Sequence, residues 1–216
     1  MSARENILAR IRANSRRTGT TSAAERAAAR STMERHERGP QPSIALREPI
    51  QHFIDECSRL KTTVQEVANV DAIPQEVARY LALESLTTNL AGWPEFAVLD
   101  WAAAGLTFDN RPANGDDLVG VTGCYCAIGE TGTVLLLGAR DTPKVTALLP
   151  ETHLCVVKKS RIVATMEDAF AMMRKEVGEP PRATFFISGP SRTADIEQTI
   201  VIGAHGPYRV HVILLP

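Results

Sequence analysis

Hydrophobic residues in the second half of the chain fall into short, continuous runs that polar or glycine-containing segments separate. A short apolar run with turn residues on both sides predicts a strand. Continuous rather than alternating apolarity is typical of strands that are covered on both faces. The sequence therefore predicts buried strands at Leu118–Thr122, Thr133–Leu137, Leu154–Val157, Thr184–Ile187 and Val210–Leu215.

Segments with helical spacing lie between and before these runs. Apolar residues recur at helical spacing from Ile50 to Leu60 and from Pro74 to Leu90. Thr165 is expected to cap a further helix, with Asp168 at its third position. We also expect a short helix at residues 143–149, strands at 62–67 and 96–99, and a loop at 105–116. Strands that alternate with helices predict an α/β fold, a mostly parallel sheet with helices on both faces.

The first part of the chain follows a different pattern. Ile7, Leu8 and Ile11 indicate a short amphipathic helix, whereas residues 14–43 contain only one large apolar residue, Met33. Burial there cannot offset an ordering entropy of about 1–2 kcal/mol per residue, so this segment is expected to be mobile or only marginally helical. We therefore expect a basic N-terminal helix and mobile arm at residues 1–43 and an α/β domain at residues 44–216.

Charge is distributed unevenly between these two parts. Residues 1–38 carry nine arginines and four glutamates, whereas the rest of the chain carries 15 basic and 21 acidic residues. A basic arm can contact nucleic acid or an acidic protein. This arm has no aromatic side chains to stack on bases, and its arginines are spread among alanines. We therefore expect it to dock on protein and expect no nucleic-acid partner.

The composition, with 44% hydrophobic and 23% charged residues, is that of a soluble globular protein. The sequence has no apolar run of about 18 residues, and its N-terminus lacks the core of a signal peptide, which predicts no membrane span and a cytoplasmic location. The four cysteines, at positions 57, 124, 126 and 155, have neither metal-site nor iron–sulfur spacing. No dinucleotide or Walker glycine pattern is present. We expect no metal and no cofactor.

The densest group of polar side chains follows the predicted strand Thr184–Ile187. Its members are Ser188, Ser191, Arg192, Thr193, Asp195 and Glu197. The segment is expected to open a helix, because Ser191 or Thr193 can cap exposed N–H groups and the two carboxylates suit a positive first turn. Arg192 would oppose the helix dipole there unless it faces a carboxylate or a phosphate.

Two other segments place glycines beside ionisable groups. The turn at residues 130–133 can bind an anion through free N–H groups, or it can be a plain turn with Glu130 in solvent. His205 is either a titratable donor or a structural histidine. Ligands of open α/β sheets bind beyond the carboxyl ends of strands, so we expect all these segments to converge on one anion-binding pocket. The candidate ligand-binding residues are Glu130, Thr131, Gly132, Thr133, Ser188, Gly189, Ser191, Arg192, Thr193, Asp195, Glu197, His205 and Gly206; none has an assigned catalytic role.

Three blocks of the sequence carry a family resemblance. GETGTVLLL, PETHLCVV and ISGPSRTADIEQTIVIGAHGPYRVHVILL resemble the signature blocks of the lactate-utilization protein C family, of the LUD domain superfamily. The resemblance implies a fold similar to the NagB/RpiA/CoA-transferase-like group. It also implies a place in a three-component bacterial system that oxidises L-lactate to pyruvate, whose other two proteins hold the iron–sulfur clusters. It supplies no established catalytic residue.

Two functional hypotheses follow. The first is a non-redox component of the L-lactate-oxidising system that binds the iron–sulfur partner subunits, a small anionic ligand, or both. The alternative is a stand-alone enzyme that acts on a phosphorylated or CoA-linked small molecule. The lack of a redox-cofactor motif favours a subunit over an independent dehydrogenase. A DNA-binding regulator that uses the basic arm is the weakest hypothesis.

Overall fold

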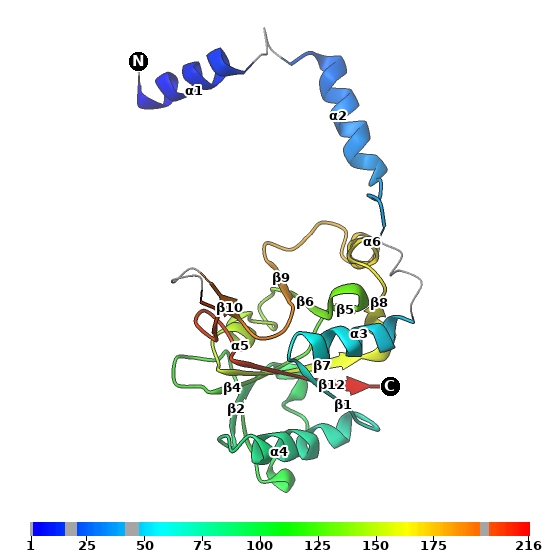
Figure 1. Ribbon diagram of the computed structural model, residues 1–216, viewed down its shortest axis with the longest axis vertical. Helices are drawn as coiled ribbons and strands as arrows, with labels where there is room; N and C mark the ends of the chain where they lie inside the picture. Colours follow the sequence, from blue (N-terminus) through cyan, green and yellow to red (C-terminus); the bar gives the residue numbers. More distant parts are fainter. Residues whose placement is uncertain (1, 16–20, 42–47, 195–198) are drawn as a thin grey trace. The chain divides into compact units, whose positions relative to one another are not determined.

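The computed structural model describes residues 2–15, 21–41, 48–194 and 199–216 (Figure 1). It divides into two compact units, residues 1–41 and 42–216. Each unit is described by itself below.

The first unit contains two helices, α1 (Ala3–Asn14) and α2 (Ala23–Arg35). Each begins with a serine that accepts a hydrogen bond from the N–H of a glutamate three residues later, and the glutamate side chain accepts from the serine N–H in return. Neither helix has a buried residue. The segment expected to be mobile or marginally helical thus contains a capped helix, which local hydrogen bonds support rather than a core.

The second unit is built on a six-stranded sheet in which every neighbouring pair is parallel. Its strands, in spatial order, are β1 (Thr63–Glu66), β12 (Arg209–Leu215), β7 (Thr152–Lys158), β4 (Val119–Thr122), β2 (Asn89–Gly92) and β3 (Thr107–Asn110). The central strands β12 and β7 are buried along almost their whole length, as their continuous apolar runs predict. The expected α/β fold with a mostly parallel sheet is confirmed.

Parallel pairing gives the sheet two chemically different ends. Thr152 of β7 lies opposite Val119 of β4 and Arg209 of β12, and these three residues mark the amino ends of the strands. Thr122, Lys158 and Leu215 mark the carboxyl ends. Cavities lie at both ends, as described below.

Helices α3 (Pro49–Arg59) and α4 (Ile73–Leu83) lie on opposite sides of the strands β1, β12 and β7 (Figure 1). Both carry a proline in the first turn, where the missing N–H costs no hydrogen bond. Their apolar faces join the core through Phe53 and Cys57 of α3 and Val77 and Leu81 of α4. The short helix α5 (Val145–Leu148) packs on β4 and β7.

Four strands form a second sheet rather than extending the first. They are β8 (Ile162–Val163), β5 (Cys126–Ile128), β6 (Thr133–Leu137) and β9 (Thr184–Ile187), in that spatial order. Strand β9 pairs antiparallel with β6. The sequence predicts one mostly parallel sheet for its buried strands, and the position of β6 and β9 in a second sheet corrects that expectation, because an apolar run that predicts a buried strand does not specify its sheet.

Helix α6 (Met166–Glu176) packs against the second sheet. Thr165 and Asp168 form the reciprocal cap that the sequence predicts. The remaining elements are 3₁₀ turns and a small hairpin: η2 (Val70–Ala72), η3 (Pro94–Phe96), η4 (Ala102–Ala104), η5 (Gly129–Thr131), η6 (Lys159–Arg161), β10 (Arg192–Thr193) and β11 (Val201–Ile202).

Three expected elements between residues 83 and 116 differ from the structure. The helix predicted to reach Leu90 ends at Leu83, and Ser85 adopts a left-handed conformation (φ 56°) that stops it. The strand predicted at 96–99 lies earlier, at β2, and Val98 is 87% exposed. Part of the predicted loop 105–116 forms the edge strand β3. Short strands with polar ends give weak sequence signals, and neighbouring strands decided their pairing.

None of the helices in the described parts of the chain is both long enough and apolar enough to span a membrane.

Candidate functional site

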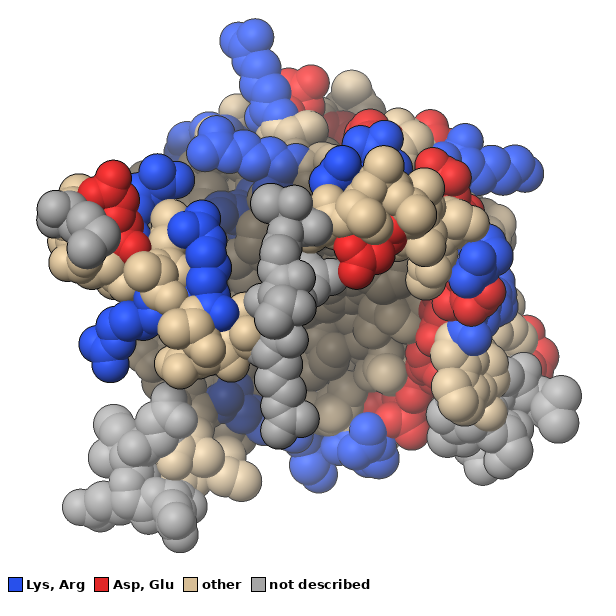
Figure 2. All heavy atoms as spheres, turned by 90° about the horizontal axis from the view of Figure 1, so that it is seen from above, with Lys and Arg blue, Asp and Glu red and all other residues tan. Residues whose placement is uncertain are grey.

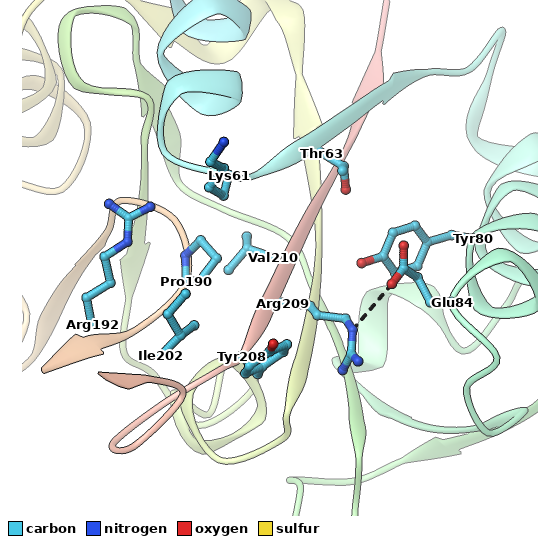
Figure 3. A pocket seen from close by; sticks show the side chains of 10 residues that line it. All are labelled: Lys61, Thr63, Tyr80, Glu84, Pro190, Arg192, Ile202, Tyr208, Arg209 and Val210. Carbon is cyan, nitrogen blue, oxygen red and sulfur yellow. Dashed lines mark ion pairs between the residues drawn. The ribbon is translucent and has the colours of Figure 1, made fainter. Parts of the chain in front are cut away.

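A cavity of about 250 Å³ lies at the amino ends of β1 and β12 (Figure 3). Its lining comes from the turn after α3, from α4, from the β10–β11 hairpin and from the start of β12. The lining residues are Lys61, Thr63, Tyr80, Glu84, Pro190, Arg192, Ile202, Tyr208, Arg209 and Val210.

Three cationic side chains from three separate segments border this cavity, which we call the basic cavity. Lys61 occupies a left-handed turn position (φ 68°) between α3 and β1, and its side chain is exposed. Arg192 on β10 donates through Nη2 to the carbonyl oxygen of Leu60 at 2.7 Å, which holds the exposed guanidinium beside that turn. Arg209 pairs with Glu84 (Nε to Oε2, 3.4 Å), so its charge is partly offset.

A buried polar chain lies beneath one wall of the basic cavity. The hydroxyl of Thr63 is 2.8 Å from Nδ1 of His211, and Nε2 of His211 is 3.1 Å from Oε1 of Glu76. The Tyr80 ring stacks on the His211 ring with centroids 4.1 Å apart. Arg79 donates to both oxygens of Glu76, at 2.7 and 2.6 Å. The chain joins residues that are 135 and 148 positions apart in the sequence.

Burial lowers the pKa of His211 to about 4, although the neighbouring Glu76 acts in the opposite direction. His211 is therefore neutral near pH 7. Burial also raises the pKa of Tyr80, with the nearby Glu84 as a second cause.

Among the predicted site residues, three hydroxyls are brought together by hydrogen bonds. Thr131 Oγ1 lies 2.7 Å from Thr133 Oγ1, which lies 2.6 Å from Ser188 Oγ. Thr133 is buried in β6, and Ser188 directly follows β9, so antiparallel pairing of these strands positions the hydroxyls. Gly189 (φ 80°) comes next, and a Cβ there would be 3.0 Å from the Leu60 carbonyl oxygen that Arg192 binds.

Glu130 has a structural partner. Its Oε1 accepts a hydrogen bond from the N–H of Met166, the first residue of α6, at 2.7 Å. The carboxylate thus stabilises the positive end of that helix instead of standing free in a solvated turn. Gly132 is required by geometry, because φ is 58° and a Cβ would be 2.8 Å from the backbone nitrogen of Cys57.

The sequence predicts that the segment after Ser188 opens a helix, but in the structure this segment forms a strand. Arg192 and Thr193 form β10, which pairs antiparallel with β11. The N–H of Ser191 donates to Pro207 O (2.9 Å), and a Cβ on Gly206 would be 3.2 Å from the Ser191 Cβ. Asp195 and Glu197 lie outside the described residues.

Arg192 lines the basic cavity, whereas His205 is exposed near Gly206. In the described segments, no side-chain hydrogen bond or ion pair links Glu130 with His205. Convergence of all the predicted residues on one pocket stays a prediction.

Most of the residues that line the basic cavity were not predicted from the sequence. Lys61, Thr63, Tyr80, Glu84 and Arg209 line it and were not among the candidates. Two of these residues are cations near the start of a strand of the main sheet: Lys61 lies two residues before β1, and Arg209 is the first residue of β12. A cation at the start of each of two neighbouring parallel strands predicts a positive site only if the pairing of those strands is known.

A second cavity of about 480 Å³ lies at the opposite, carboxyl ends of β4, β7 and β12. Three charged residues line it, Glu95, Lys158 and Arg161, and the lining also includes Phe96, Val156 and Leu215. Arg161 is paired with Glu176 (Nη2 to Oε2, 2.9 Å). Glu95 is exposed as a residue, but partial burial of its carboxyl group raises its pKa, and Lys158 opposes this shift. A Cβ on Gly123 would overlap that carboxyl group, so Glu95 lies directly over a glycine.

The described residues contain no group of three or more His, Cys, Asp or Glu side chains that could hold a metal ion. Burial raises the pKa of Cys57 and of Cys126 to about 12, which makes both poor thiolate nucleophiles near neutral pH. On the face drawn in Figure 2, Lys and Arg side chains are interspersed with Asp and Glu. Binding of an anion must therefore be argued from the local groups of a cavity.

A model of the LUD domain family matches residues 50–215, from the start of α3 to the last residue of β12. The chain belongs to the LUD domain family. The predicted family membership is thereby confirmed, and the matched LUD residues include both sheets and both cavities.

Curated LUD relatives carry the name "Lactate utilization protein C". One from Bacillus licheniformis is 29% identical over 185 residues, which cover 74% of this chain and 75% of that protein. Another, from Bacillus subtilis, is 37% identical over 100 residues, or 45% of this chain and 42% of the relative. The crystal structure of a DUF162 family protein from Deinococcus radiodurans matches with a TM-score of 0.58 and 24% identity, over 82% of this chain and all of that one. That similarity supports the fold.

Proposed function

We propose that this LUD protein takes part in lactate utilization as a non-redox component that binds a small organic anion in the basic cavity. The names of its relatives support the process, and the cavity supports the chemistry. We further propose iron–sulfur subunits as its partners, and the basic segment 1–43 as an arm outside the α/β domain that can dock on such a partner.

The arrangement of Lys61, Arg192 and Arg209 around one cavity is the observation that carries this proposal. Lys61 has no side-chain partner among the hydrogen bonds and ion pairs of the described residues, and Arg192 binds only a backbone carbonyl there. Both cations therefore remain available for a charge-assisted hydrogen bond with a carboxylate. Glu84 offsets Arg209, which leaves net positive charge at the cavity.

The cavity volume separates this function from its alternative. Typical pockets for drug-sized ligands are about 300–1,000 Å³, and the basic cavity is smaller than that range. A volume of about 250 Å³ suits an acid of a few carbon atoms. A stand-alone enzyme for a phosphorylated or CoA-linked molecule stays the second candidate, because phosphate would find the same cations, but a whole CoA would have to extend outside the cavity.

Arg192→Ala tests the proposal. Loss of a hydrogen bond to a charged group costs about 1.5–3 kcal/mol, so the affinity for L-lactate should fall about 10- to 100-fold in calorimetric titrations. Thermal stability should change little, because Arg192 is exposed. Arg174→Ala, on the exposed surface of α6, is the matched control and should bind as the parent does.

The same variants should differ in a host whose growth on L-lactate depends on this gene. Arg192→Ala should impair growth and Arg174→Ala should not. Equal affinities of both variants for every small acid tried, with parental growth of both, would refute an anion site at Arg192.

A further inference from the structure

The basic cavity also offers a basis for selecting among small acids, and this inference rests on the proposed anion site. The three cations around it can bind any carboxylate, so they do not distinguish one small acid from another. Three residues of the lining carry a hydroxyl group, Thr63, Tyr80 and Tyr208, and Thr63 is the one whose hydroxyl is hydrogen-bonded to the buried His211. The direction of this hydrogen bond is set by the polar chain beneath the cavity wall.

The carboxylate of Glu76 determines which groups donate and which accept in this chain of hydrogen bonds. This carboxylate is almost fully buried, with 7% of its side chain exposed, and Arg79 donates to both of its oxygens. A carboxylate can only accept hydrogen bonds, so the 3.1 Å contact with His211 requires a proton on Nε2 of the imidazole.

The proton on Nε2 in turn determines the role of Nδ1, the other ring nitrogen of His211. The neutral ring carries one proton, and Glu76 requires it on Nε2, so Nδ1 is unprotonated and accepts. Its partner at 2.8 Å is the hydroxyl of Thr63, which must donate its only proton.

The Thr63 hydroxyl therefore presents oxygen lone pairs, and no proton, to the basic cavity. We propose that Thr63 accepts a hydrogen bond from the ligand, so that the cavity selects acids with a hydroxyl group on the carbon next to the carboxylate over the corresponding 2-oxo acids. A 2-hydroxy acid supplies the donor that Thr63 lacks, whereas a carbonyl oxygen at the same position would face a lone pair. A ligand with the wrong group at this position loses the hydrogen bond and places two lone pairs against each other, which lowers its affinity.

Matched pairs of acids test the inference by titration calorimetry. L-Lactate should bind at least about tenfold more tightly than pyruvate, and 2-hydroxybutyrate more tightly than 2-oxobutyrate by a similar factor. Propionate, which has neither group, measures the contribution of the carboxylate alone.

Thr63→Val should reduce the ratio between hydroxy and oxo acids to near one while leaving propionate binding unchanged. Valine has a similar shape and favours strands, and an unchanged unfolding transition would show that β1 is intact. Thr63→Ser keeps the hydroxyl and should keep the preference.

The outcomes separate the inference from the function on which it rests. Equal binding of hydroxy and oxo acids by the parent protein, or an undiminished preference in Thr63→Val, would overturn the role of Thr63 but leave the anion site standing. If lactate, pyruvate, propionate and inorganic phosphate all fail to bind, both the proposed anion site and the inference that rests on it are refuted.

Discussion

The two ends of the parallel sheet differ in how their polar groups are held. At the amino ends, His211 is fixed between Thr63 and Glu76 inside the core, and the nearby cavity is lined by the exposed cations Lys61 and Arg192 and the half-buried Arg209. At the carboxyl ends, Glu95 lies over Gly123 in a cavity that Lys158 and Arg161 also line, and its carboxyl group makes no hydrogen bond among the described residues. Open α/β sheets generally bind ligands beyond the carboxyl ends. The basic cavity that we propose for a small acid lies at the other end of this sheet, where topology alone would not place it.

Lowering the pH should produce the largest effect of this difference between the two ends of the sheet, as a loss of stability. Burial lowers the pKa of both His153 and His211 to about 4, from about 6.5 in the unfolded chain. Between these values the unfolded chain binds more protons than the native protein, so its free energy of unfolding falls as the pH drops. The loss should reach about 3 kcal/mol per histidine between pH 6.5 and pH 4.

His153→Gln should remove about half of this acid-induced loss in denaturant titrations across that range. His36→Asn, at the exposed C-terminal cap of α2, is the control and should leave the slope unchanged. A parental slope in His153→Gln would show that the amino ends do not control acid stability.

Glycine substitutions test whether the amino ends of the sheet are rigidly packed while the carboxyl ends can adjust to an added methyl group. In Gly120→Ala, the new methyl group would overlap the backbone carbonyl of Thr146 near the amino ends, and overpacking of this kind should cost about 3 kcal/mol. In Gly123→Ala, the methyl group would meet only the flexible end of Glu95, so we expect a cost below about 1 kcal/mol. Denaturant titration of both variants measures the difference, and similar costs would contradict it.

The smallest expected effect is a gain in stability rather than a loss. Because partial burial raises the pKa of Glu95, the ionised carboxyl group destabilises the native protein, and its contribution worsens as the pH rises through that titration. Glu95→Gln should therefore raise the unfolding temperature at pH 7, and the gain should vanish in acid. Glu66→Gln, at the same end, removes an ion pair with Lys159 and should give no gain. A lower unfolding temperature for Glu95→Gln would show that the carboxylate is stabilising.

How far the sequence predicts this molecule depends on the range of the interactions concerned. The continuous apolar runs predicted β7 and β12, and Thr165 predicted the start of α6, because these signals are local. The strands β2 and β3 were missed because they are short and polar at one end. Membership of the second sheet could not be predicted from β9, which resembles any buried strand.

The candidate site was only partly predictable for the same reason. Arg192 was identified as an unexplained cation, although the helix that made it conspicuous is a strand in the structure. The chain from Glu76 through His211 to Thr63 could not be predicted, since its members are brought together only by the pairing of β1 with β12. Its residues are individually ordinary, and no spacing in the sequence connects them.

The position of β12 between β1 and β7 has a consequence for how the protein is made. Synthesis proceeds from the N-terminal side, so β1 emerges long before the partner whose His211 lies opposite its Thr63. Until that strand arrives, β1 and the facing edge of β7 expose unpaired backbone groups, and such open edges favour aggregation. The wait spans 148 residues of chain, and the risk of aggregation at these edges lasts as long. The hydrogen bond between Thr63 and His211, on which the proposed selectivity depends, forms only with the same late pairing.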